Sequence, residues 1–395
     1  MTPERIVFAT KGLRTLGDGL MGIALAQLVV VSGISNLRAG LLASVALVGT
    51  SLATLLIGRY VERIGRRRVL RWGAILTVAT GIAYAYASSQ AYWALAAVGF
   101  LGTFNPTEGD VSALLPIEQT ILAQQTRLGT RVQAFASFNV VGALGGALGS
   151  LLTGSTQLLE RAGVSPLWAV KLLFLGYSVI GALTWLLVRR LPPAVELATT
   201  PTRGGLGRSR KRVLTLSTLF GLDAFAGGLA VRTLTALFLF RKFGAEPATT
   251  ATVFFVVGVL AALSYPISAR FSVRWGVVPT MVFSHLPANL LFFGLALAPN
   301  LPTAVGFMLA RALISQMDVA PRQALVVSLV SPEERAAAAA VTGVARSIAA
   351  TPAPSLGGML LGSGASGAPF ILAGTLKSIY DLALLAGFRK VELRD

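Results

Sequence analysis

The chain has 395 residues, of which 54% are hydrophobic and only 13% charged, and its mean hydropathy is +0.72. Soluble domains carry about 25% charged residues, so a soluble multidomain enzyme is excluded. The net charge of +18 would favour a nucleic-acid partner in a soluble protein, but membrane proteins concentrate Lys and Arg in cytoplasmic loops. We therefore expect an integral membrane protein embedded in a lipid bilayer, with no nucleic acid as partner.

Composition also limits the chemistry. The chain has no cysteine and one histidine, which excludes disulfides and Cys-based zinc sites and leaves little for any other metal site. The sequence has no glycine-rich phosphate-binding loop ending in Gly-Lys-Ser/Thr, so ATP-driven transport by this chain is not expected. We expect no enzyme activity, no metal and no cofactor.

Twelve apolar segments follow one another along the chain, each long enough for a spanning helix of about 20 residues. The polar start MTPERIVFATK has no convincing signal-peptide cleavage site, so the first segment is expected to be retained. Residues 189–212, rich in Pro, Gly, Thr and Arg, are predicted to be a flexible polar linker. The predicted spans are 12–33, 39–58, 69–88, 91–116, 131–154, 166–188, 213–240, 248–269, 276–297, 301–325, 336–362 and 367–388.

The basic residues are distributed unequally over the loops between these spans. With a cytoplasmic N-terminus, and with residues near the end of a span assigned to the adjacent side, 24 of the 34 Lys and Arg residues fall on the cytoplasmic side and five on the outer side, with five deeper inside spans. This bias predicts that both termini are cytoplasmic and that the number of spans is even. We expect a multi-pass protein of the plasma (inner) membrane.

The two halves of the chain carry related segments. Gly58-Arg59-x-x-x-Arg63-x-Gly65 after the second span recurs 211 residues later as Ala269-Arg270-x-x-x-Arg274-x-Gly276 after the eighth. Pro116-Ile117-Glu118-Gln119 in the fourth span has a counterpart in Pro321-Arg322-Gln323 of the tenth. The repeat predicts two six-span halves built on one template.

The segment from Gly58 to Arg68 resembles the loop 2–3 signature of the major facilitator superfamily, in which an acidic residue, Arg-x-Gly and a basic cluster follow a helix-ending glycine. The resemblance covers essentially the whole chain. It implies an all-α integral membrane protein with twelve transmembrane helices in two pseudo-symmetric six-helix bundles. The implied domains are an N-terminal bundle at 1–188, a cytoplasmic linker at 189–212 and a C-terminal bundle at 213–395.

In this family the loop acts as a latch between the halves in one conformational state. The position usually held by Asp is Glu62 here, which keeps the charge on a longer arm. The alternative is that the basic cluster only fixes orientation by its charge. The latch candidates are Gly58, Arg59, Glu62, Arg63, Gly65, Arg66, Arg67 and Arg68.

Ionisable residues inside spans are costly at bilayer depth and mark functional sites by default. Most of them fall on spans one, four, seven and ten, which line the central cavity in the family that the chain resembles. The coupling and cavity candidates are Asp18, Glu108, Asp110, Glu118, Asp223, Arg232, Arg311, Asp318, Arg322 and Arg346.

Spacing predicts partners for some of these charges. Glu118 and Arg322 occupy equivalent positions in the two halves with opposite signs, which raises the hypothesis of a gate between them. In three pairs, two oppositely charged residues lie four positions apart on one helix face and are able to neutralise each other. These pairs are Arg14 with Asp18, Asp318 with Arg322, and Lys377 with Asp381. A structural salt bridge is the favoured interpretation of the last pair.

The fourth span is the least regular. Pro106, Gly109 and Pro116 interrupt it, so the stretch is predicted to be a cavity wall. A desolvated carboxylate in this stretch could exchange a proton. Glu108 and Asp110 are the first candidates for this role, and Asp18 of the first span is the next. The alternative is that these carboxylates form fixed ion pairs.

Two other features have weaker functional interpretations. His285 could relay protons, but a simple buried hydrogen bond is the more common role of such a histidine. Closely spaced glycines from Gly142 to Gly149 are predicted to let helices approach closely. Drug:proton antiporters of the family add a proline to this motif, which is missing here.

The leading functional prediction is a monomeric secondary transporter that moves a small solute by rocker-switch alternating access, as proton-coupled efflux. The first alternative is an importer or exchanger of a small anion that uses the cavity arginines. The second is a membrane receptor or lipid-handling scaffold without transport activity.

Overall fold

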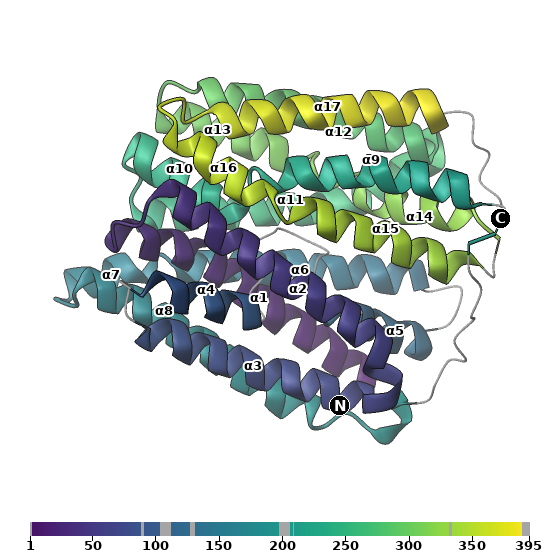
Figure 1. The fold of residues 1–395 in the computed structure, drawn as a ribbon, viewed down its shortest axis with the longest axis horizontal. Coiled ribbons are helices and arrows are strands. Elements are labelled where there is room, and N and C mark those ends of the chain that lie inside the picture. The colour runs from purple at the N-terminus through teal and green to yellow at the C-terminus, as the bar shows by residue number, and fades with distance from the viewer. Residues whose placement is uncertain are drawn as a thin grey trace. The chain divides into compact units, whose positions relative to one another are not determined.

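The computed structural model describes residues 2–87, 91–102, 112–126, 131–196, 206–207, 209–331 and 334–388. Its regular elements, all helical over this part of the chain, are drawn in Figure 1. They are α1 Pro3–Val31, α2 Asn36–Ile64, α3 Arg66–Tyr86, α4 Tyr92–Leu101, α5 Leu115–Gln125, α6 Arg131–Leu152, α7 Ser155–Arg161, α8 Pro166–Val188, the 3-10 helix η2 Pro193–Glu196, α9 Arg210–Gly228, α10 Arg232–Phe243, α11 Pro247–Trp275, α12 Val277–Leu297, α13 Leu301–Ala312, α14 Val319–Ser328, α15 Arg335–Ala350, α16 Ala353–Gly362 and α17 Ala368–Phe388.

The internal contacts divide the chain into two compact units. Unit 1 comprises Met1–Ala198 and Val231–Val259, and unit 2 comprises Thr199–Ala230 and Leu260–Asp395. The chain therefore changes unit after Ala198, after Ala230 between α9 and α10, and after Val259 within the long helix α11. The halves expected from the repeat, 1–188 and 213–395, remain a prediction from the sequence.

Nine helical segments of the described residues are long and apolar enough to cross a membrane. They correspond to predicted spans one, two, three, five, six, seven, eight, nine and twelve. They run Pro3–Val31, Asn36–Val61, Arg66–Tyr86, Ala134–Arg161, Pro166–Val188, Arg210–Phe243, Pro247–Ser272, Val277–Leu297 and Ala368–Phe388. The total of twelve remains a prediction.

The other three predicted spans are each divided between two shorter helices. Span four, predicted at 91–116, corresponds to α4 and the start of α5, with residues 103–111 outside the described ranges. Span ten, predicted at 301–325, is broken between Ala312 and Val319, and span eleven between Ala350 and Ala353. Pro321 and Pro352 lie at or just after these last two breaks, where the missing N–H and the proline ring disfavour a continuous helix.

Unit 1 is held together by close helix pairs, above all α1 with α6 and α3 with α8. The glycines of α6 explain the first contact, because a Cβ at Gly149 would lie 1.9 Å from the backbone oxygen of Leu16 on α1. The prediction of close approach at these glycines is therefore correct, and the contact lies within one unit. A buried cluster that includes Ile6, Val69 and Phe138 fills the end of the unit near the α2–α3 turn.

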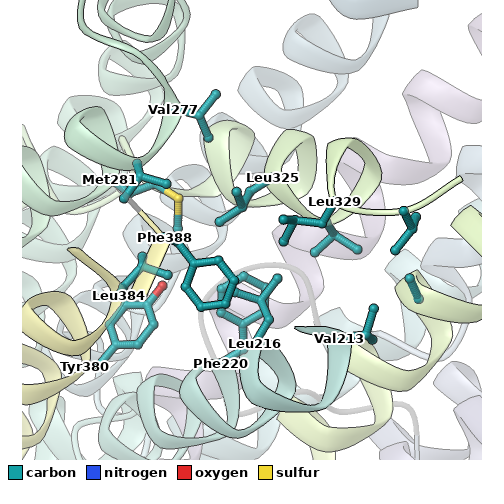
Figure 2. Close-up of a cluster of buried hydrophobic side chains, with 14 of the residues drawn as sticks. Val213, Leu216, Phe220, Val277, Met281, Leu325, Leu329, Tyr380, Leu384 and Phe388 are labelled. Atoms are coloured by element: carbon teal, nitrogen blue, oxygen red, sulfur yellow. The ribbon is translucent and has the colours of Figure 1, made fainter. Parts of the chain in front are cut away.

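Unit 2 has its own apolar core, shown in Figure 2. Phe220 of α9, Met281 of α12, Leu325 of α14 and Tyr380 of α17 meet there with little or no exposure. Burial of such side chains from water stabilises the folded state by about 1.5–3 kcal/mol each, an upper figure for a protein surrounded by hydrocarbon. The core places α9, α14 and α17 together, and these helices carry Asp223, Arg322 and Lys377, respectively.

Candidate functional site

The charged centre of unit 1 is Arg14, which lies between two carboxylates. Its Nη2 donates to Glu118 Oε2 at 2.7 Å and its Nε to Oε1 at 3.4 Å, so the guanidinium is bonded to Glu118 at two points. The Asp18 Oδ2 atom is 3.7 Å from Arg14 Nη1, and the Asp18 side chain is 18% exposed. Charge-assisted hydrogen bonds strengthen as they shorten, so Arg14 is committed to Glu118 and only weakly paired with Asp18.

Other polar groups surround this triad. Lys11, one turn earlier on α1, and Arg232 of α10 both act electrostatically on Asp18, and Tyr177 of α8 acts on Arg14. The Lys11 Nζ lies 4.8 Å from the ring centre of Phe138. These groups come from three different helices of unit 1.

Arg232 was predicted to lie in the cavity, and the structure places it at the start of α10 beside α6. Its Nη1 donates to Ser150 Oγ at 2.8 Å and to the Gly146 carbonyl at 3.3 Å. Its guanidinium carbon lies 5.8 Å from the ring centre of Phe254. Arg232 thus joins α10 and α6 inside unit 1.

The charged centre of unit 2 is Asp223 of α9, a buried carboxylate that three cations contact. Lys377 Nζ lies 2.5 Å from Oδ1, while Arg322 Nη1 and Arg346 Nη1 lie 3.3 and 3.4 Å from Oδ2. Arg322 Nη1 is also 3.1 Å from Asp318 Oδ2, so the predicted pair of Asp318 and Arg322 forms. Three cations face two carboxylates here, and we call these five residues the Asp223 cluster.

The prediction that Lys377 pairs with Asp381 is wrong. Lys377 binds Asp223 instead, and the fully buried Asp381 accepts from Asn289 Nδ2 at 2.7 Å and faces His285 Nδ1 at 3.1 Å. A pair four residues apart on one helix contributes only about 0.2–0.5 kcal/mol. Leaving the buried carboxylate of Asp223 with fewer partners costs more than that, so contacts between helices prevail.

His285 has the role that is more common for a lone buried histidine. Its ring is buried, bonded to Asp381 and set edge-on to Tyr380, with ring centres 6.1 Å apart. This contact links α12 to α17 next to the Asp223 cluster.

Glu118 and Arg322, the two residues of the hypothetical gate, each have partners within their own unit. Glu118 binds Arg14, and Arg322 binds Asp223 and Asp318. The gate itself stays a hypothesis.

Two candidates, Glu108 and Asp110, lie outside the described residues. Arg311 lies on α13 with its guanidinium carbon 4.0 Å from the ring centre of Phe292. Among the residues that the structure describes, no three His, Cys, Asp or Glu side chains are grouped so as to hold a metal ion.

The loop 2–3 segment forms the turn between α2 and α3. Gly65 has φ of +98° there, and its counterpart Gly276 between α11 and α12 has φ of +88°, a region that strongly favours glycine. Arg59, Arg63 and Arg68 are exposed. Glu62 lies in α2, and its side chain is not among those described.

The α2–α3 turn also receives a residue that sequence reasoning missed. Glu196, at the end of η2, accepts from the backbone N–H groups of Arg66 at 2.6 Å and Arg67 at 3.0 Å. A carboxylate at this position satisfies free donors at the start of α3 and favours the helix dipole. The available signal was a single acidic residue after Pro192-Pro193 in an otherwise basic linker.

A second carboxylate binds the other end of the linker. The Gly207 N–H and the hydroxyl of Ser209, just before α9, both donate to Glu334. These hydrogen bonds lower the pKa of the Glu334 carboxyl below its ordinary value. Each unit thus fixes one end of the linker with a glutamate.

Membrane-spanning helices that are interrupted beside buried ionisable residues are a recurrent construction of secondary transporters. A sequence profile described as Major Facilitator Superfamily matches residues 7–354. The chain therefore belongs to the Major Facilitator Superfamily. It is also 23% identical over 426 residues to the uncharacterized membrane protein YJR124C of Saccharomyces cerevisiae, covering 99% of this chain and 95% of that protein.

Solved transporter structures share the fold. The xylose transporter XylE from E. coli, in an inward open conformation, matches with a TM-score of 0.75 and 14% identity over 99% of this chain and 96% of its own. The nucleoside transporter NupG matches with a TM-score of 0.74 and 14% identity, over 99% of this chain and 100% of its own. The human organic anion transporter MFSD10 (TETRAN) matches with a TM-score of 0.66 and 18% identity, over 97% of this chain and 100% of its own. The protein is accordingly a multi-pass secondary transporter rather than an enzyme.

Proposed function

We propose that this protein exports a small solute in exchange for protons by rocker-switch alternating access, and that Asp18 carries the proton. The observation that carries the proposal is the unequal sharing of Arg14 between a tightly bound Glu118 and a loosely paired, partly exposed Asp18. An ionised carboxylate at bilayer depth needs a partner, and Asp18 pairs with an arginine that is already bonded to Glu118. Asp18 is the described candidate best arranged to take up a proton.

The charge balance of the triad supports this assignment. With both carboxylates ionised, Arg14, Asp18 and Glu118 carry one net negative charge, and one proton on Asp18 makes them neutral. Lys11 of α1 and Arg232 of α10 are further cations that act on Asp18. A carboxylate that is able to gain and lose a proton suits exchange with either side of a membrane.

We place the protein as a monomer in the plasma (inner) membrane with both termini in the cytoplasm. The distribution of basic residues supports this orientation. Short loops and the lack of sugar or peptide signatures favour efflux over import.

The test uses everted membrane vesicles with an imposed pH gradient, monitored by a pH-sensitive dye while a panel of solutes is added. A transported solute is expected to dissipate the gradient in the parent protein and not in Asp18→Asn. Glu160→Gln, which removes a carboxylate from the short helix α7, is the matched control and should behave as the parent. Solute movement at an unchanged rate after the pH gradient is collapsed would contradict proton coupling.

The second candidate is import or exchange of a small anion. It is favoured by the Asp223 cluster, where three cations face two carboxylates and leave one positive charge in excess. An anionic solute could displace Asp223 from Arg346, the least buried of the three cations. Transport measured in right-side-out and inverted vesicles separates the candidates: anion uptake that survives Asp18→Asn and is lost in Arg346→Gln favours this second function.

A further inference from the structure

Unit 1 contains a cavity of about 390 Å³ between α2 and α3. Ala53 and Leu56 of α2 and Trp72 and Ala74 of α3 line its sides, and Arg14 with Glu118 lies at its inner wall. Its lining is otherwise almost entirely apolar. The volume falls in the range of pockets that bind small molecules, about 300–1,000 Å³.

The outer rim of the cavity consists of exposed apolar side chains. Leu52, Leu56, Trp72 and Leu76 all line it and are all exposed, with Trp72 at 57%. Both helices are membrane-spanning segments, where the surrounding medium is hydrocarbon rather than water. The rim therefore presents the cavity to lipid chains.

The cavity follows the length of α2. Its lining extends along this helix from Gly49 to Ile64, which corresponds to about 22 Å at 1.5 Å per residue. Half of a bilayer's hydrocarbon core is about 15 Å thick, so the cavity is long enough to reach from the bilayer centre to the interface. One end lies at Ile64 and Val69, on either side of the turn at Gly65, so the cavity runs from the interface towards the bilayer centre.

Positive charge gathers at the interfacial end. Arg59, Arg63 and Arg68 are exposed on the last turns of α2 and the first turn of α3, next to the cavity-lining Tyr60. Arginine binds phosphate oxygens with two parallel hydrogen bonds, and each basic residue near an anionic membrane surface contributes about 1 kcal/mol of attraction.

From this arrangement we infer that unit 1 binds one anionic phospholipid, with an acyl chain in the cavity between α2 and α3 and its phosphate at Arg63 and Arg68. The chain would exclude water from the inner wall. Because hydrogen bonds between charged groups strengthen when water is excluded, the bound lipid would tighten the bond from Arg14 to Glu118. The site depends on membrane insertion, and its lipid contact can be measured whether or not transport is coupled to protons.

Fluorescence of Trp72 provides the test, in a variant whose other tryptophans are changed to phenylalanine. The protein is reconstituted in phosphatidylcholine vesicles that contain a small mole fraction of one brominated lipid. This lipid is either phosphatidylglycerol or phosphatidylcholine, and in both cases the bromine is on the acyl chain. We expect several-fold greater quenching of Trp72 by the brominated phosphatidylglycerol. Equal quenching by the two lipids would overturn the inference.

Two matched variants separate the cavity from general lipid contact. Ala53→Phe fills the cavity and should abolish the excess quenching, while Leu55→Phe, at an exposed neighbouring position outside the cavity, should retain it. Excess quenching that persists in a folded Ala53→Phe protein would contradict a chain in the cavity. The double change Arg63→Gln and Arg68→Gln should remove the preference for phosphatidylglycerol, and an unchanged preference would exclude these arginines as the phosphate site.

Discussion

The charged centres of the two units are built in opposite ways. In unit 1 two carboxylates share one arginine, and one of them, Asp18, stays partly exposed with a long contact. In unit 2 three cations converge on the buried Asp223, and the second carboxylate, Asp318, binds one of the same arginines. The three charged residues of unit 1 therefore sum to one negative charge, and the five of the Asp223 cluster sum to one positive charge.

The difference shows what an internal repeat preserves. Glu118 and Arg322 are 204 residues apart at equivalent positions, and each joins the centre of its unit, yet their charges are opposite. The repeat thus sets where ionisable side chains lie, and the residue type sets the local charge. The repeated segments thus contribute to a centre with a negative sum of charges in unit 1 and to one with a positive sum in unit 2.

The largest effect is expected from Asp223→Asn. Removal of this charge leaves Lys377, Arg322 and Arg346 close together in a buried site, and breaking a buried ion pair costs about 3–5 kcal/mol. Denaturant unfolding in detergent micelles should report that loss in the free energy of unfolding. Adding Lys377→Met should restore part of it, and a single variant as stable as the parent would disprove the central role of Asp223.

A smaller loss is expected from Glu118→Gln. The change removes the best partner of Arg14, but Asp18 lies one turn away and can take over the guanidinium, so we expect a cost of about 1–3 kcal/mol. The same unfolding measurement applies. The double variant Glu118→Gln with Asp18→Asn should lose clearly more than the sum of the two single changes, whereas simple additivity would argue against a shared Arg14.

Asp18→Asn alone should hardly change stability. Its contact with Arg14 is long, at 3.7 Å, and Arg14 keeps its bonds to Glu118 when the charge of Asp18 is removed, so we expect a loss of about 1 kcal/mol or less. The unfolding midpoint should therefore stay close to that of the parent, while proton-coupled transport is lost. A large drop in stability would identify Asp18 as a structural partner of Arg14.

The smallest effect concerns the linker contact of unit 2. Because hydrogen bonds lower the pKa of Glu334 in the folded protein, its stabilising contribution is present above the ordinary carboxyl pKa and is lost as the pH falls through the lowered value. In that acidic range the Gly207 amide should become less protected against hydrogen exchange, once the exchange rate is corrected for its intrinsic pH dependence. Glu334→Gln should remove this pH dependence, and a parent profile without it would contradict the bond.

Sequence patterns predicted what depends on local composition. The nine long spans, the tight glycine contact of α6 and the pair of Asp318 with Arg322 all follow from hydropathy or spacing along one helix. The partner of Lys377 does not, because the competing carboxylate, Asp223, is 154 residues away and meets it only through the packing of α9 and α17. The role of Glu196 was hidden for the same reason.

Two glutamates hold the ends of the linker and limit its free length. Residues 189–212 contain 24 positions, but Glu196 holds one end against α3 and Glu334 holds Gly207. Ten residues lie between these fixed points, and the eleven steps from Glu196 to Gly207 reach about 36–40 Å when fully extended. While both carboxylates stay bonded, the free part of the linker has this maximum length, and loss of either bond would lengthen it.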